Sequence, residues 1–433
     1  MTNPQEHPLV FSARFPGLID IVDNDGEPSF LVMVEGLPEC VAEWHGKRPP
    51  PRDGLPFLLP RLQAVMGAYS DDTDDALFAD LVDYFAAVSE LPSDAHRLLL
   101  AAWTAHTYLM ERWDYSPILL LFAVPERGKS RTGKAVAYAS YRGLHSETIR
   151  EPILFRWSHD LGATLFLDVR DIWRKAEKQG ADDILLQRFE RGAKVGRVLW
   201  PDRGPFRDTR YYEVFGATVI ATNEAADHIL DSRAITINMP DADREFPEPV
   251  TRQAGLLLRE RLVAFRARHL EAELPNTPRL THGRLSDIIH PLATIVELMA
   301  PQHLEAFRAL VGTIETARLA DKSTTIEARI IEAMLGLGDK VEGGKLGVQA
   351  ITVAINEGQS ERYRRGTRSV GWKLTALGLT RARFSDGTRA VEYDPEQLAR
   401  LAAHYGVHVR VPPDKTSSSS ETSAPDISHP RRS

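Results

Sequence analysis

The stretch Ile118–Gly143, ILLLFAVPERGKSRTGKAVAYASYRG, decides the fold that we expect for the chain. Its first residues form an apolar run between Pro117 and Pro125, which is typical of a buried strand. A short loop follows, and Ser130–Tyr141 has the composition of a helix. A strand, a loop and a helix with Gly-Lys-Ser at the junction predict a phosphate site. Backbone N–H groups of the first helical turn point at the anion, the lysine neutralises its charge, and the hydroxyl completes a Mg²⁺ shell.

Two alignments of this loop with the pattern G-x-x-x-x-G-K-[ST] are open. In the first, Ala123 replaces the leading glycine and Ser130 supplies the hydroxyl; in the second, Gly128–Ala135 has both glycines but lacks the hydroxyl. We prefer the first, because it begins where the strand ends and leaves about three turns of helix before Gly143. An ordinary basic loop is the alternative to both. In the first alignment the nucleotide-binding residues are Pro125, Glu126, Arg127, Gly128, Lys129, Ser130 and Arg131.

The composition is that of a globular protein with more than one domain. The chain has 433 residues, of which 43% are hydrophobic and 26% charged. Its net charge of −7 means that any surface for nucleic acid must be local. The single cysteine, Cys40, excludes an intramolecular disulfide framework. Because we also find no signal peptide and no apolar run long enough to span a membrane, we expect a cytoplasmic protein.

Changes of pattern along the chain divide it into five expected regions. Alternating apolar residues near the N-terminus indicate strands, and the spacing becomes helical before the phosphate loop. The regions are a β-rich part (1–57), a helical collar (58–112), a P-loop core with a helical lid (113–320), a winged helix (321–410) and a Pro/Ser-rich tail (411–433) expected to be disordered.

Two later strands are followed by polar side chains that suit the same site. Ala163–Asp168 ends in a carboxylate, which can hold the hydration shell of Mg²⁺ beside Ser130. Phe215–Thr222 is followed by Asn223, whose amide can orient the water that attacks a terminal phosphate.

Two arginines are further candidates for the nucleotide site. Arg233 precedes a fifth strand-like run, and its guanidinium can neutralise charge on a nucleotide held by a neighbouring subunit. Arg284 begins a segment that resembles a lid helix, from which it can reach nucleotide phosphate.

With these motifs in this order, residues 118–239 resemble an AAA+ P-loop ATPase. More narrowly, the segments PERGKS, LFLD, IATN and SRAITINM are similar to those of the helicase-like ATPase domains of phage, plasmid and island primase-helicases. The resemblance implies ATP and Mg²⁺ as cofactors. It assigns the Walker A end to Gly128, Lys129 and Ser130, the Walker B acid to Asp168, sensor 1 to Asn223 and the arginine finger to Arg233.

The chain departs from the family pattern at two positions. Ala123 replaces the first glycine of the loop, and Val169 stands where the family carries the glutamate that polarises the attacking water. Either Asp171, the nearest acid, takes that catalytic role, or hydrolysis is slow.

Basic and aromatic residues are interleaved between Arg188 and Arg210. This segment has seven Lys or Arg against three acids, with Trp200 and Phe206 among them. On a hairpin, such residues suit the backbone of DNA and the stacking of single-stranded bases. A solvated hairpin with salt bridges between subunits is the equally weighted alternative. The expected DNA contacts are Arg191, Lys194, Arg197 and Arg203.

The C-terminal part reverses the acidic balance of the chain. Ser360–Ala390 has eight Lys or Arg against two acids. Helices expected over Thr324–Leu335, Val348–Ile355 and Thr367–Leu377, followed by two strands around an Asp-Gly turn, predict a winged helix. The third helix would enter a DNA groove, and a protein-docking module is the alternative. The expected phosphate contacts are Arg364, Arg365, Arg368, Lys373, Arg381, Arg383 and Arg389.

The expected fold is therefore α/β, with an AAA+ type P-loop core, an N-terminal α+β region and a C-terminal winged helix. The expected function is an ATP-hydrolysing, DNA-acting motor of a mobile element or replication system. It would form a homo-oligomeric ring, with a hexamer as one form, on single-stranded or forked DNA. Two alternatives are an ATP-switched DNA-binding regulator or loader, which Val169 favours, and a non-hydrolysing nucleotide-binding scaffold, which Ala123 favours.

Overall fold

The computed structural model describes residues 10–224 and 228–407, which fall into two compact units divided between Thr313 and Ile314. Helix α11 (Leu304–Ser323) runs through this division, so the expected boundary at residue 320 falls inside a helix. The expected tail, 411–433, lies outside the described residues. Within the described residues, no helix combines the length and apolar character needed to cross a membrane.

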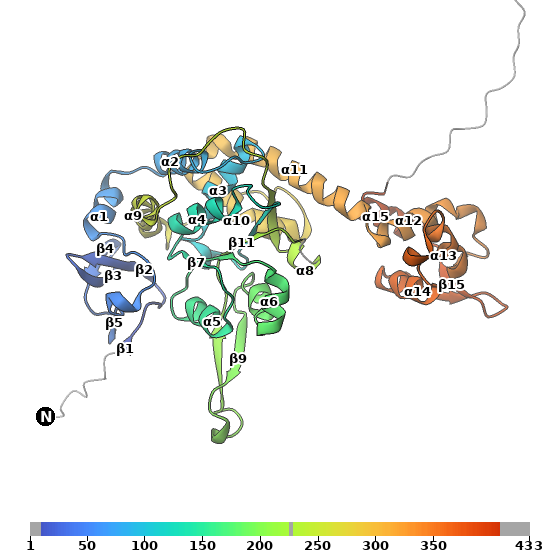
Figure 1. The fold of residues 1–433 in the computed structure, drawn as a ribbon, viewed down its shortest axis with the longest axis horizontal. Helices are drawn as coiled ribbons and strands as arrows, with labels where there is room; N and C mark the ends of the chain where they lie inside the picture. Colours follow the sequence, from blue (N-terminus) through green and yellow to red (C-terminus); the bar gives the residue numbers. More distant parts are fainter. Residues whose placement is uncertain (1–9, 225–227, 408–433) are drawn as a thin grey trace, which may run out of the picture. The chain divides into compact units, whose positions relative to one another are not determined.

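A five-stranded parallel sheet forms the centre of the first unit (Figure 1). Parallel sheets are covered on both faces, which explains why its strands are continuous apolar runs. The carboxyl ends of all five strands lie at one edge of the sheet, where α/β proteins place their ligands. The predicted α/β class is confirmed. In spatial order the strands are β12 (Ala234–Asn238), β6 (Ile118–Phe122), β11 (Thr218–Thr222), β8 (Leu165–Asp168) and β7 (Leu144–Ser146).

Helix α4 (Lys129–Ala139) follows β6 and packs closely on the sheet. A Cβ atom added at Gly133 would lie 2.2 Å from the ring of Phe166, so only glycine allows this approach. Helix α9 (Arg252–His269) in turn packs on α4, where a Cβ at Gly255 would lie 2.5 Å from the carbonyl oxygen of Tyr138.

The N-terminal region is a three-stranded antiparallel meander followed by helices. Buried ion pairing joins the meander to the core: Asp20 accepts a hydrogen bond from Arg142 at 2.7 Å, and both side chains are 1% exposed. The elements are β1 (Val10–Phe11), β2 (Leu18–Asn24), β3 (Glu27–Val34), β4 (Leu37–Val41), β5 (Lys47–Arg48), α1 (Leu62–Asp71), α2 (Asp74–Ala86) and α3 (Asp94–His106).

A two-stranded hairpin projects from the body of the first unit (Figure 1). It consists of β9 (Lys194–Val198) and β10 (Thr209–Glu213), paired antiparallel. The remaining helices of this unit are α5 (Glu151–His159), α6 (Ile172–Gln179), α7 (Asp182–Gln187), α8 (His228–Asp231) and α10 (Gly283–Met299).

The second unit packs four helices and a small antiparallel sheet around one apolar core, which includes Ile331, Ile351, Leu374 and Leu398. The helices are α12 (Ile326–Gly336), α13 (Val348–Asn356), α14 (Thr367–Ala376) and α15 (Pro395–Tyr405). The sheet, in the order β13–β15–β14, consists of Lys345–Gly347, Arg389–Glu392 and Arg381–Arg383.

Candidate functional site

The loop between β6 and α4 has the tight backbone that a phosphate cradle requires. Glu126 and Gly128 both have left-handed φ angles, of 67° and 76°. A residue with a side chain rarely adopts this conformation, and such strain concentrates at functional sites. Helix α4 begins at Lys129, as the first alignment requires, and Gly133 lies inside the helix rather than in the loop.

The ammonium group of Lys129 is turned back onto this loop. Its Nζ donates to the carbonyl oxygens of Ala123 and Val124, each at 2.7 Å. Burial lowers the pKa of Lys129, and the negative charge of Asp168 opposes that shift. A nucleotide phosphate would offer the ammonium stronger, anionic acceptors in place of the two carbonyls. The loop therefore fits a phosphate ligand.

The predicted acid and amide lie at the same edge of the sheet as the loop. The register pairs Ala221 of β11 with Asp168, the last residue of β8, and pairs Thr222 with Phe122 at the end of β6. Asn223 follows Thr222 directly and is exposed, as is Ser130 at the start of α4. The structure thus brings Lys129, Ser130, Asp168 and Asn223 to one edge.

A Mg²⁺ ion has few protein ligands available there. Residues 10–224 and 228–407 contain no group of three or more His, Cys, Asp or Glu side chains placed to hold a metal ion. The Ser130 hydroxyl and the Asp168 carboxylate fit an ion that takes its other ligands from water and phosphate, which is the usual mode of Mg²⁺.

The residues that follow Asp168 do not provide a second acid next to it. Val169 is buried, at 3% exposure. Asp171 has a left-handed φ of 53° immediately before α6 and pairs with Arg174 at 3.0 Å. It remains at the carboxyl edge of the sheet because it lies in the turn that follows β8.

The collar contributes contacts to the site that the sequence did not indicate. The hydroxyl of Ser89, in the turn after α2, lies 2.6 Å from that of Thr132 in the first turns of α4. Arg131 donates through Nε to the carbonyl of Val88 at 2.6 Å. No motif marks Val88 or Ser89, because they reach the loop only through the folding of the collar.

The two arginines lie away from the phosphate loop of their own chain. The carbonyl of Arg233 accepts from Ile118 N at 3.1 Å, so Arg233 is at the start of β6, the opposite edge of the sheet. Its side chain donates to the carbonyl of Leu186 at 2.8 Å. Arg284 donates to Ser232 at 3.2 Å, beside Arg233. Arg284 therefore lies near this opposite edge within its own chain, and its contact with nucleotide phosphate stays a prediction.

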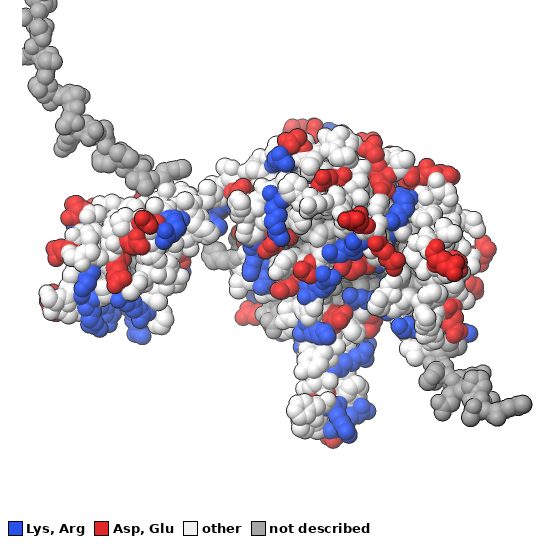
Figure 2. Space-filling view, turned by 180° about the vertical axis from the view of Figure 1, so that it is seen from behind, with Lys and Arg blue, Asp and Glu red and all other residues white. Residues whose placement is uncertain are grey.

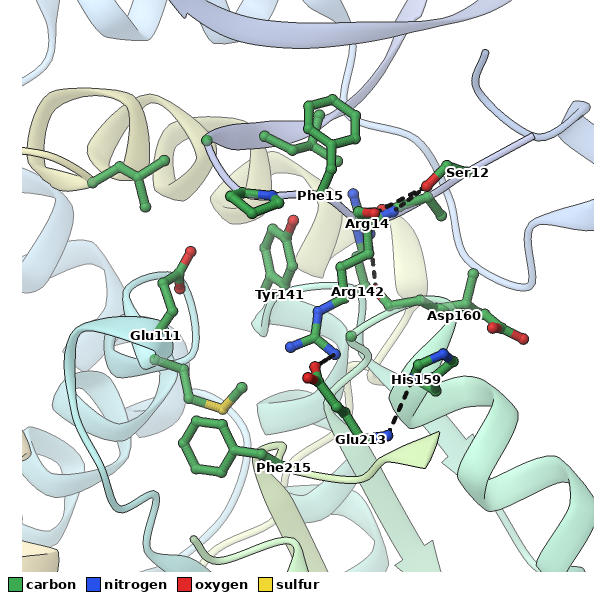
Figure 3. Close-up of a pocket in the computed structure, with 18 of the residues that line it drawn as sticks. Ser12, Arg14, Phe15, Glu111, Tyr141, Arg142, His159, Asp160, Glu213 and Phe215 are labelled. Atoms are coloured by element: carbon green, nitrogen blue, oxygen red, sulfur yellow. Dashed lines mark hydrogen bonds and ion pairs between the residues drawn. The ribbon is translucent and has the colours of Figure 1, made fainter. Parts of the chain in front are cut away.

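A cavity of about 1120 Å³ also lies toward that opposite edge, beneath the N-terminal segment (Figure 3). Arginines in its wall are paired with carboxylates, including Arg14 with Glu213 at 3.6 Å and Arg266 with Glu111. Because these cations are already neutralised, the cavity is a poor site for polyphosphate and is separate from the loop at Lys129.

The projecting hairpin has a paired base and an exposed tip. At the base, Arg191 pairs with Asp114 at 2.5 Å and Arg197 pairs with Glu151, so these two predicted DNA contacts are engaged within the chain. Lys194 and Arg203 are exposed. At the tip, the Arg203 guanidinium lies 4.5 Å from the ring of Trp200, and Phe206 is 100% exposed.

Lys and Arg side chains gather on this hairpin and on one face of the second unit (Figure 2). In the second unit, Trp372 of α14 is 63% exposed, and the guanidinium of Arg381 lies 5.7 Å from its ring. Lys373 pairs with Glu327 of α12 at 2.5 Å, so this predicted DNA contact is engaged within the unit. The other predicted contacts, Arg364, Arg365, Arg368, Arg383 and Arg389, are exposed.

No protein-family model and no curated protein matches this chain. Two solved apo structures of the NrS-1 C-terminal region align with 87% of the chain and 96% of their own, at 12% identity. The TM-scores are 0.33 and 0.35. A superposition at this level assigns neither a family nor an activity to the chain.

Proposed function

We propose that this protein is a DNA-acting motor that hydrolyses ATP at the carboxyl edge of the central sheet. The observation that carries the proposal is the junction of β6 and α4. There Gly128 ends a tight loop, α4 begins at Lys129, and the Lys129 ammonium is held by two loop carbonyls at 2.7 Å each.

Each residue at this edge has a role in the proposal. Lys129 and the first N–H groups of α4 bind the phosphates, and Ser130 and Asp168 hold Mg²⁺. When bound, Mg²⁺ supplies positive charge that offsets the charge on the phosphate oxygens. Asn223 orients the attacking water, and Asp171 accepts its proton.

Two surfaces support DNA as the partner. The hairpin tip presents Arg203 and Phe206, a combination that suits phosphate contact and stacking on single-stranded bases. In the second unit, helices α12, α13 and α14 precede the β14–β15 strands, and this order supports a winged helix with α14 as the helix for a DNA groove. Its exposed arginines and Trp372 suit a duplex backbone.

Two observations favour a second candidate function, an ATP-switched DNA-binding regulator. Val169 is buried where an acid would polarise water, and Asp171 is paired with Arg174 at 3.0 Å. A site with these features can bind ATP and hydrolyse it slowly, which suits a switch better than a motor.

The experiment is ATP turnover by the wild type, Lys129→Ala and Lys134→Ala, with and without single-stranded and forked DNA. A motor should show turnover that DNA stimulates and that Lys129→Ala abolishes, while Lys134→Ala, inside α4, retains it. It should also separate the strands of the fork. ATP binding with little turnover would select the switch, and absence of ATP binding would contradict both candidates.

A further inference from the structure

A segment that follows β12, residues 239–250, lies across the candidate phosphate loop; we name it the strap. Met239 N donates to the carbonyl of Phe122 at 2.9 Å, where β6 ends. Asp241 pairs with Arg127 of the loop at 2.9 Å. Farther along, the carbonyl of Glu248 accepts from Arg131 in the first turn of α4. The strap therefore forms one wall of the site that Lys129 occupies.

The opposite wall is the turn of the collar after α2. Arg244 of the strap donates to the carbonyl of Ala86 and lies 3.5 Å from the carboxylate of Glu90. Arg131 donates to the carbonyl of Val88 at 2.6 Å. Arginines thus join the two walls.

Phe246, the single aromatic residue of the strap, lies near both of these arginines. The guanidinium carbon of Arg244 is 4.6 Å from the ring centroid, and that of Arg131 is 5.9 Å away. The side chain is partly buried and lies close to the first turn of α4. Its ring is thus a stacking surface next to the candidate phosphate site, and planar cations now occupy it.

We propose that Phe246 stacks the purine base of the nucleotide whose phosphates are bound at Lys129. The inference rests on the proposed function, because it requires a nucleotide at the loop. A guanidinium and a purine are both planar and both stack on an aromatic ring, so the base takes the place of one arginine. The base extends from the phosphates through the ribose, and the strap beside Arg131 is within reach of such an extension. The carbonyls of Val88 and Glu248, which now accept from Arg131, are acceptors for an exocyclic amino group.

The test compares ATP with inorganic tripolyphosphate, which has phosphates but no base, by titration calorimetry on the full chain with Mg²⁺. Phe246→Leu keeps apolar volume but removes the ring, and it should weaken ATP binding roughly tenfold while leaving tripolyphosphate binding unchanged. Phe246→Tyr keeps the ring and should bind ATP as the wild type does. Phe11→Leu, the same change at an exposed phenylalanine of β1, is the matched control and should leave the binding of both ligands unchanged.

The outcomes separate this inference from the proposed function. If Phe246→Leu binds ATP as well as Phe246→Tyr does, or loses both ligands equally, the stacking assignment is overturned. If the wild type binds ATP and Lys129→Ala does not, the nucleotide site stands whatever Phe246 does. If the wild type binds neither ligand, the proposed function fails and this inference fails with it.

Discussion

The pair of Asp20 and Arg142 shows how single residues hold the N-terminal sheet on the core. Both side chains are 1% exposed, and Arg142 also donates to the carbonyl of Leu161 at 2.8 Å. A buried pair of this kind adds little net stability over apolar residues, but removing one partner leaves a buried charge without its counter-ion.

Asp20→Asn should therefore lower the free energy of unfolding by about 3 kcal/mol or more, measured by urea unfolding. Asp23→Asn is the control on the same strand. Asp23 pairs with Arg52 at 2.6 Å, but the arginine side chain is 52% exposed, so its loss should cost about 1 kcal/mol or less. If the two variants lost equal free energy of unfolding, burial would not be what makes the Asp20–Arg142 pair important.

His106 makes the stability of the first unit depend on pH. Burial lowers its pKa from 6.5 to about 3, against a smaller opposing effect of Glu111. Between these pH values the unfolded chain takes up a proton that the folded chain does not, so stability is lost as the pH falls. This residue alone should contribute a slope of up to about 1.4 kcal/mol per pH unit. His106→Gln cannot take up that proton and should show a shallower slope in urea unfolding from neutral to mildly acidic pH; identical slopes would contradict the prediction.

Strands that are long apolar runs could be predicted from the sequence. Short strands that tertiary contacts fix in place could not. The central strands β6, β8 and β11 are apolar runs, and the candidate residues follow them in order. Strands β7 and β13 have three residues each, too few to show a period.

The sequence marks the start of the last helix of the second unit at Asp394 and Pro395. Helix α15 begins after Asp394, whose side chain accepts from the N–H groups of Glu396 and Gln397 at 2.9 and 3.2 Å. An aspartate followed by proline is a strong helix start. In the site, by contrast, Ser89, Phe246 and the true position of Arg284 depend on chain folding that no local pattern records.

The close packing of helix α4 on the sheet can be tested by substitution at Gly133. Gly133→Ala places a Cβ 2.2 Å from the ring of Phe166, so it should destabilise the protein by about 1–3 kcal/mol through overpacking. Gly67→Ala, in α1, meets no atom within 4 Å and should stabilise by about 0.5–1 kcal/mol. Thermal unfolding of both variants tests this, and a stabilised Gly133→Ala would show that α4 does not press on the sheet as described.

The position of Arg233 in the molecule determines whether it can act within one chain or only between subunits. Arg233 lies at the opposite edge of the sheet from Lys129, about one strand length away, so it does not reach the loop of its own chain. A catalytic role for it requires a neighbouring subunit, which agrees with the proposed ring.

Mixing two inactive variants tests this arrangement. Lys129→Ala and Arg233→Ala should each lack ATP turnover, whereas their mixture should regain part of it, because some interfaces then combine an intact Lys129 with an intact Arg233. Turnover by Arg233→Ala alone, or a mixture that stays inactive, would contradict action between subunits. Lys134→Ala mixed with the wild type is the control for the mixing procedure and should leave turnover unchanged.

The exposed hairpin tip also makes the protein susceptible to limited digestion. Arg203 and Arg207 lie in the turn between β9 and β10, both exposed, and exposed turns are where proteases cut folded chains first. Trypsin should therefore nick the chain there early, leaving two fragments still joined through the β9–β10 ladder and visible only after denaturation. If the tip contacts nucleic acid, adding DNA should slow this nick while cuts elsewhere keep their rate. The hairpin would then act as a built-in footprinting reporter, needing no label.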